Sequence, residues 1–263
     1  MAEFNPTGLD DYKPAEMARL VEELGVRKAH MPAVQLFTLA VLAGAFIGFG
    51  ALAFTMVMTG VDLAFGPARF LGGIVFSLGL ILVIVGGAEL FTGNALLVMA
   101  LVDGRIGIGA VLRNWGIVYA GNLCGALGLV VLVALAHLMA GPMGDTARRI
   151  ALAKAALPLD VAFVRGILCN ALVCLAVWLT ISARSATGKI LAIVWPISAF
   201  VLLGLEHSVA NMYLVPAGWV AGAEVSPAAF LSTLAAVTAG NVVGGAGGVG
   251  LAYWLAYRPA RQG

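Results

Sequence analysis

Charged residues are scarce in this chain of 263 residues, at 11% Asp, Glu, Lys and Arg against 62% hydrophobic residues. Soluble domains carry about 25% charged residues, so the composition and the mean hydropathy of +1.02 indicate an integral membrane protein. Basic residues do not form a stripe interleaved with aromatic residues, and the net charge is only +2. No nucleic-acid partner is therefore expected.

Cysteine is also scarce, and Cys124, Cys169 and Cys174 all fall in apolar segments. An odd number of cysteines in such positions indicates packing, so neither a disulfide framework nor a metal site is expected, and no cofactor. The first 31 residues are charged and lack a short apolar region with a cleavage site. We therefore expect no removable signal peptide, and the first membrane span is expected to direct insertion.

What the chain has in abundance is long apolar runs, each at or above the roughly 20 residues that a helix needs to cross a bilayer. They lie at about 33–59, 70–101, 108–140, 161–181, 190–220 and 228–257. This pattern predicts an all-α membrane protein with six transmembrane helices. Several runs are longer than a crossing requires, so tilting or interruption is expected.

The runs define the expected domain organisation. Residues 1–32 form a cytoplasmic segment with a short amphipathic helix, because Met17, Leu20, Val21 and Leu24 recur at helical spacing. Residues 33–257 form the six-span domain, with halves 33–140 and 161–257, and residues 258–263 form a cytoplasmic tail.

The distribution of Lys and Arg predicts that both termini are cytoplasmic, with ten basic residues inside and five outside. The inside residues are Lys13, Arg19, Arg27, Lys28, Arg105, Arg113, Arg184, Lys189, Arg258 and Arg261. The outside residues are Arg69, Arg148, Arg149, Lys154 and Arg165, most of them in the loop between the third and fourth runs.

An ordered set of polar residues occurs twice. Glu89 is followed five positions later by Asn94, and Glu206 in the same way by Asn211. Gly-Asn-x-x-Gly then follows each pair, at 121–125 and at 240–244. Three spans per half require the second half to cross the membrane in the opposite direction, so the sequence predicts an aquaporin-like inverted repeat of three plus three with helices two and five interrupted. The two Glu–Asn pairs are expected to support the broken helices.

His207 lies beside Glu206 within an apolar run. Ionisable residues at membrane depth cost roughly 2.5–3.5 kcal/mol each and usually face a cavity or a partner, so they mark a site. Imidazole, with an unperturbed pKa of about 6.5, suits proton exchange near neutral pH. The alternative is that these side chains only satisfy broken backbone in a packed bundle.

These motifs resemble those of the formate/nitrite transporter family, and in particular its formate channels. The matching stretches are DYKPAEMA at 11–18, AELFTGN at 88–94, RNW at 113–115, GNLCG at 121–125, RGILCNALVCLAVW at 165–178, LEHSVANMYLVP at 205–216 and GNVVGG at 240–245. The resemblance implies a homopentamer in a bacterial-type cytoplasmic (inner) membrane, with a separate pore through each protomer.

The resemblance also assigns roles to side chains. Thr92 falls at the pore threonine, His207 at the central histidine, and Asn241 near it. Leu90, Phe91 and Phe200 match residues that narrow the pore, and Lys154 matches a vestibule lysine. Gly93-Asn94 replaces the hydroxyl pair common in formate channels and is closer to nitrite-type members, so the preference between formate and nitrite stays open.

The expected function is a channel or transporter for small monovalent anions of weak acids, most of all formate, with protons exchanged at His207 and the lipid bilayer as its surroundings. Nitrite or hydrosulfide is the alternative substrate, and passive and proton-coupled transport both stay open. A neutral-solute channel of the aquaporin type is disfavoured because paired Asn-Pro-Ala turns are lacking. An intramembrane enzyme is not expected, since no nucleophile stands with a base and His30 and His137 are isolated.

Overall fold

The structure, a computed structural model, describes residues 11–257, and within that range it is helical with no strand. The segment 258–263, expected to be a cytoplasmic tail, lies outside the described residues, as do residues 1–10. The helices that make up most of the apolar runs are α2 (Ala33–Val57), α3 (Phe65–Gly86), α5 (Ile108–Leu135), α7 (Leu159–Ser182), α8 (Ala186–Leu202) and α10 (Pro227–Val242). The remaining elements are α1 (Pro14–Ala29), η1 (Gly93–Leu97), α4 (Val98–Val102), α6 (Pro142–Ala155), α9 (Ser208–Val220), η2 (Val243–Leu251) and α11 (Ala252–Tyr257).

Among the described residues, five helices are long and apolar enough to cross a membrane. They are α2, α3, α5, α7 and the continuous helix Pro227–Tyr257, which comprises α10, η2 and α11. Two further apolar helices, Gly93–Val102 and Ala186–Leu202, are shorter.

Two apolar runs contain a non-helical segment each. In the first, α3 ends at Gly86, Gly87 adopts φ +81°, and helix resumes at Gly93. In the second, α8 ends at Leu202, Gly204 adopts φ +68°, and α9 begins at Ser208. Both glycines take the left-handed conformation that residues with a Cβ rarely adopt, which is why the helices end at these places.

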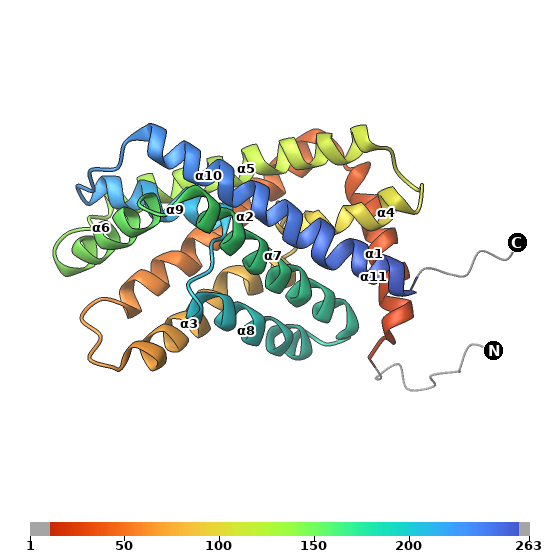
Figure 1. Cartoon of the computed structure of the whole chain (residues 1–263), viewed down its shortest axis with the longest axis horizontal. Coiled ribbons are helices and arrows are strands. Elements are labelled where there is room, and N and C mark those ends of the chain that lie inside the picture. Colours follow the sequence, from red (N-terminus) through yellow and green to blue (C-terminus); the bar gives the residue numbers. More distant parts are fainter. Residues whose placement is uncertain (1–10, 258–263) are drawn as a thin grey trace, which may run out of the picture.

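The stretch between the third and fourth apolar runs is a helix, whereas the sequence pattern predicts a basic loop. Pro142 occupies the first turn of α6, and the segment behind it is rich in alanine, so local preference favours a helix. This helix packs against α9, while α1 packs against η1 and α4. Figure 1 shows α1 and α6 at opposite ends of the molecule, with α11 at the same end as α1.

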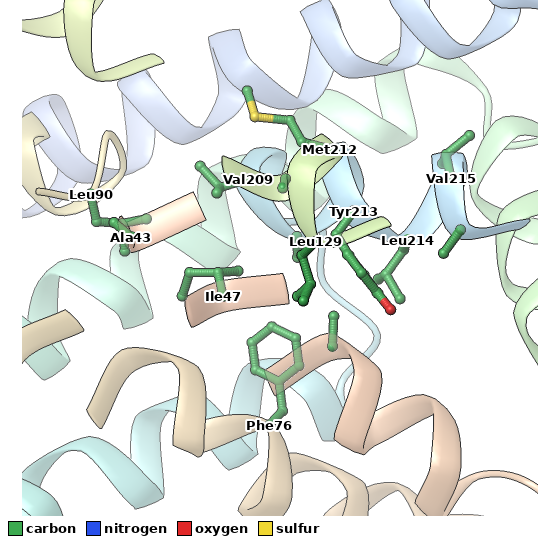
Figure 2. Close-up of a cluster of buried hydrophobic side chains, with 14 of the residues drawn as sticks. Ala43, Ile47, Phe76, Leu90, Leu129, Val209, Met212, Tyr213, Leu214 and Val215 are labelled. Carbon is green, nitrogen blue, oxygen red and sulfur yellow. The ribbon is translucent and has the colours of Figure 1, made fainter. Parts of the chain in front are cut away.

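The core lies between these ends. α2 packs along α5 in the first half, and α7 packs along α10 in the second. Side chains from α2, α3, α5 and α9 meet in the middle of the bundle, including Ile47, Phe76, Leu129 and Tyr213 (Figure 2). This packing fixes the two non-helical segments in the interior and so positions the polar residues that they carry.

Candidate functional site: a hydroxyl–imidazole pair between two cavities

Asn122, on α5, holds the non-helical segment of the first half. Its Oδ1 accepts a hydrogen bond from the Phe91 amide at 2.9 Å. Its Nδ2 donates to the carbonyls of Ala40 at 2.8 Å and Glu89 at 2.9 Å. The fully buried carboxamide of Asn122 thus forms hydrogen bonds with backbone groups that a continuous helix would otherwise pair.

Asn241, on α10, does the same in the second half. Its Oδ1 accepts from the Ser208 amide at 2.9 Å, and its Nδ2 donates to the carbonyls of Gly166 at 2.9 Å and Glu206 at 3.0 Å. Asn241 therefore binds the residues on both sides of His207. Because Asn122 flanks Leu90 in the same manner, His207 occupies in the second half the place that Leu90 occupies in the first.

Each half also has a buried glutamate paired with a lysine. Lys154 Nζ, on α6, lies 2.8 and 3.0 Å from the carboxylate oxygens of Glu206, and Asn211 Nδ2 donates to the same carboxylate at 2.8 Å. The carboxylates thus accept hydrogen bonds from side chains, while Asn122 and Asn241 bind the nearby backbone amides. A cation and an amide partner offset the cost of burying each carboxylate.

The counterpart of Lys154 is Lys28 on α1, which sequence reasoning did not single out. Its ammonium lies 2.9 Å from Glu89 Oε1 and donates to Asn94 Oδ1 at 2.9 Å, and Asn94 Nδ2 donates to Glu89 at 2.8 Å. Lys28 could have been recognised from its position in the sequence, because both lysines come shortly before the start of the next long helix, α2 or α7.

Thr92 and His207 are brought together from the two halves. Thr92 Oγ1 lies 3.0 Å from His207 Nε2, and both residues are buried. The Ala210 amide donates to His207 Nδ1 at 3.1 Å. Since Nδ1 accepts, a neutral imidazole carries its proton on Nε2 and donates it to the threonine hydroxyl. The hydroxyl hydrogen of Thr92 is then available to a further acceptor.

Two residues in the motif at 165–178 fix the backbone of Thr92. Asn170 was not singled out from the sequence, and Cys174 was expected only to pack. Asn170 Nδ2 donates to the carbonyl of Thr92 at 3.2 Å and to that of Asn241 at 2.6 Å. The Cys174 thiol donates to the Thr92 carbonyl at 3.4 Å. Asn170 therefore joins the two halves of the chain directly beside the hydroxyl–imidazole pair.

The RNW motif supports the first half in a similar way. Asn94 Nδ2 donates to Asn114 Oδ1 at 2.9 Å, and Asn114 Nδ2 donates to the Lys28 carbonyl at 3.0 Å. Trp115 Nε1 donates to the Asn94 carbonyl at 2.9 Å. These bonds tie α1 and α5 to the segment that follows Thr92.

Two cavities lie on either side of the pair. The large cavity, of about 420 Å³, faces α6 and includes His207, Phe200, Lys154 and Glu206 in its lining. The small pocket, of about 60 Å³, is lined in part by α1, with Lys28, Leu90, Gly93 and Asn94. Since His207 lines the large cavity and Gly93, next to Thr92, lines the small pocket, the pair separates the two.

The aromatic residues expected near the pore take different places. Phe200 lies parallel to the imidazole of His207, with ring centroids 6.0 Å apart, at the inner end of the large cavity. Phe91 packs edge-on against Trp115 and Tyr119, with centroids 6.1 and 4.9 Å away. Phe200 thus borders the pair directly, while Phe91 packs against α5.

A bundle of apolar helices, with two non-helical segments meeting at a buried hydroxyl–imidazole pair between two cavities, defines a membrane transport protein. The model of the formate/nitrite transporter family matches residues 15–255, and the chain belongs to that family. It is 40% identical to the formate channel FocA of Escherichia coli K12, over 93% of this chain and 94% of the relative. It is 37% identical to the nitrite transporter NirC of Salmonella typhimurium LT2, over 82% and 80%. The solved structure of a pentameric formate channel with formate bound matches with a TM-score of 0.80 at 39% identity, covering 86% of this chain and 98% of that one.

Proposed function

We propose that the chain is a membrane channel for formate and similar small monovalent anions of weak acids, with one pore through each protomer of a homopentamer. The observation that carries this proposal is the Thr92–His207 pair, buried between two cavities with a Lys–Glu pair on each side. FocA, a formate channel, and the pentameric formate channel with formate bound support it as relatives.

The proposed topology has six spans in two inverted halves. The second span is α3 with η1 and α4, and the fifth is α8 with α9. The matched Asn122 and Asn241 networks, together with α1 and α6 at opposite ends (Figure 1), support this arrangement. With both termini on the cytoplasmic side of a bacterial-type inner membrane, the small pocket beside α1 faces the cytoplasm and the large cavity faces outward.

Charge is the main barrier along this path. A carboxylic acid with a pKa near 4 is about one-thousandth neutral at pH 7, so neutralising it costs about 4 kcal/mol. Carrying the ionised form past Phe200 and Leu90 without hydrogen-bonding partners costs more. A substrate that takes up a proton at the Thr92–His207 pair crosses more easily than the anion.

The hydrogen bonds of His207 suggest how such a proton moves. Protonation at Nδ1, by solvent in the large cavity, gives an imidazolium whose Nδ1–H faces the Ala210 amide at the positive end of α9, so this state is short-lived. Thr92 passes its hydroxyl proton to the substrate anion and receives the Nε2 proton in exchange. The products are a neutral acid and an imidazole with its proton on Nδ1. The reverse steps return a proton to Nε2 and release the anion on the other side, and loss of the Nδ1 proton to solvent then restores the starting imidazole with its proton on Nε2.

Formate uptake into vesicles containing the purified protein tests the proposal, with uptake measured as a function of external pH. The His207→Phe variant removes both ring nitrogens, and we expect it to lose proton-coupled uptake. His137→Asn is the control that removes an imidazole elsewhere: the position is exposed, on the turn after α5, and its φ of 55° is one that asparagine tolerates, so this variant should transport as the wild type does. Unchanged pH-dependent uptake in His207→Phe would remove the imidazole from the mechanism.

Nitrite is the second candidate substrate. It is favoured by Gly93-Asn94 after the pore threonine and by the similarity to NirC. Uptake of labelled formate in the presence of increasing nitrite ranks the two anions, and stronger inhibition by nitrite than by unlabelled formate would make nitrite the preferred substrate.

A further inference from the structure

The large cavity carries more positive charge than its one carboxylate can balance. Its lining includes four basic side chains, namely Arg69, Arg149, Lys154 and Arg165. The only carboxylate among its lining residues is Glu206, and both oxygens of that carboxylate already contact Lys154. The positive charge that remains in the cavity therefore belongs to the arginines.

Two of these arginines converge on Gly204. Arg165 Nη1 lies 3.5 Å from the Gly204 carbonyl oxygen, a long hydrogen bond. A Cβ placed on Gly204 would lie 3.3 Å from Arg69 Nη2. Arg69 comes from α3 in the first half and Arg165 from α7 in the second, so two distant parts of the chain bring like charges to one residue.

Arg69 has few partners for its five N–H donors. Its guanidinium carbon lies 5.4 Å from the centroid of the Phe65 ring, a contact that engages none of the in-plane N–H donors. Its Nε is buried and, within the part of the chain that the structure describes, has no hydrogen-bond partner. A buried donor without an acceptor is unfavourable, and so is the approach of a second cation, which makes an anion the missing partner.

We propose that Arg69 and Arg165 bind a free oxyanion in the large cavity, before it reaches Thr92 and His207. Guanidinium groups present paired donors that match the two oxygens of a carboxylate or similar oxyanion. Lys154, which matches a vestibule lysine, is paired with Glu206, so the arginines supply the positive charge that attracts an anion. The inference rests on the proposed function only for the route of the anion, not for its binding.

A purely structural role makes a different prediction. If the two guanidinium groups only brace the backbone at Gly204, then replacing them lowers thermal stability and leaves anion binding unaffected. If they hold an anion, its affinity depends on both of them.

Sulfate is a suitable probe, because its oxygens can bridge two guanidinium groups and its double charge keeps it from crossing an apolar constriction. Calorimetry on purified protein in neutral detergent measures its affinity, with chloride, which is not an oxyanion, used to keep ionic strength constant. We expect one sulfate per protomer in the wild type, and at least tenfold weaker binding in Arg69→Gln and in Arg165→Gln. Formate should compete with sulfate in the wild type.

Arg148→Gln is the matched control. Arg148 lies on α6 near the same cavity, but it is exposed and paired with Asp145. The Arg148→Gln substitution removes one positive charge, as the other two variants do, but changes no residue that lines the cavity. Sulfate affinity should therefore stay as in the wild type. If the glutamine variants fail to fold, Arg69→Lys and Arg165→Lys are used instead. They keep the positive charge but lose the paired N–H donors of the guanidinium group, so weaker sulfate binding is expected there too.

Wild-type affinity in the Arg69 and Arg165 variants, or no sulfate binding by the wild type, would overturn the proposal. The proposal would also be overturned if sulfate binding were lost in nanodiscs of anionic lipid but kept in nanodiscs of neutral lipid, because a lipid headgroup would then be the ligand.

Formate uptake separates the two proposals: a protein that binds sulfate through both arginines but takes up no formate refutes the proposed function alone. Formate uptake with unchanged sulfate affinity in the variants refutes the arginine site alone.

Discussion

Lys28 and Lys154 occupy equivalent positions in the two halves of the chain. The ammonium of Lys28 lies 2.9 Å from Glu89, and that of Lys154 lies 2.8 Å from Glu206. Each lysine is carried by an amphipathic helix, α1 or α6, that precedes a long apolar helix. The proposed repeat therefore includes α1 and α6 as well as the apolar segments.

Lys154→Met should destabilise the protein by about 3–5 kcal/mol, because it leaves Glu206 buried without its cation. Lys28→Met should have a smaller effect, since its side chain is 28% exposed against 16% for Lys154. Thermal unfolding in detergent measures both. The double variant Lys154→Met/Glu206→Gln should be more stable than Lys154→Met alone, and equal stability of the two would contradict the charge argument.

Thr92→Val keeps the shape of the side chain but removes the hydroxyl that accepts from His207 Nε2. An unsatisfied buried donor costs about 1–3 kcal/mol, so formate uptake should fall by about tenfold or more. Thr92→Ser keeps the hydroxyl and should retain most of the uptake. Wild-type rates in Thr92→Val would show that the hydroxyl takes no part in conduction.

Asn122→Leu and Asn241→Leu should each lower stability by about 3 kcal/mol or more, because each removes three hydrogen bonds to buried backbone. Thr55→Val is the control, since its buried hydroxyl donates only to Ala51 in its own helix. Similar losses for the two asparagines are expected from their matching networks. A loss no larger than that of the control, read from thermal unfolding, would show that the non-helical segments are held by other contacts.

Gly87→Ala should cost about 1–2 kcal/mol from its positive φ alone, because nothing lies within 4 Å of the added Cβ. Gly204→Ala has the same backbone strain, and its Cβ also approaches Arg69 Nη2. It should therefore weaken sulfate binding as well as stability, whereas Gly87→Ala should change stability only. Equal effects on sulfate affinity would argue against the contact between Arg69 and Gly204.

The polar motifs were predictable from the sequence because they recur at fixed spacing. Glu89 and Glu206, and the asparagines of the Gly-Asn-x-x-Gly motifs, stand in apolar runs where any polar residue is conspicuous. Lys28 could not be recognised this way, since a lysine on an amphipathic helix is ordinary. Its role depends on how α1 folds back onto η1, which local spacing does not encode.

The helix α6 and the role of Asn170 were missed for other reasons. In α6 the basic residues drew attention to charge, although Pro142 followed by small residues already favoured a helix. Asn170 lies in a long apolar helix, and its partners are backbone carbonyls of Thr92 and Asn241, which are far away in the sequence. Only the three-dimensional packing brings these groups together.

The bonds of Asn170 also bear on how the protein moves. Its single carboxamide ties the Thr92 carbonyl of one half to the Asn241 carbonyl of the other. Alternating-access carriers rock one repeat against the other in every cycle. Here such rocking would break the bond from Asn170 to the Thr92 carbonyl at each turnover, while the bond to Asn241 lies within the second half and would move with it. The contact between the halves therefore suits a rigid frame through which solutes pass one after another.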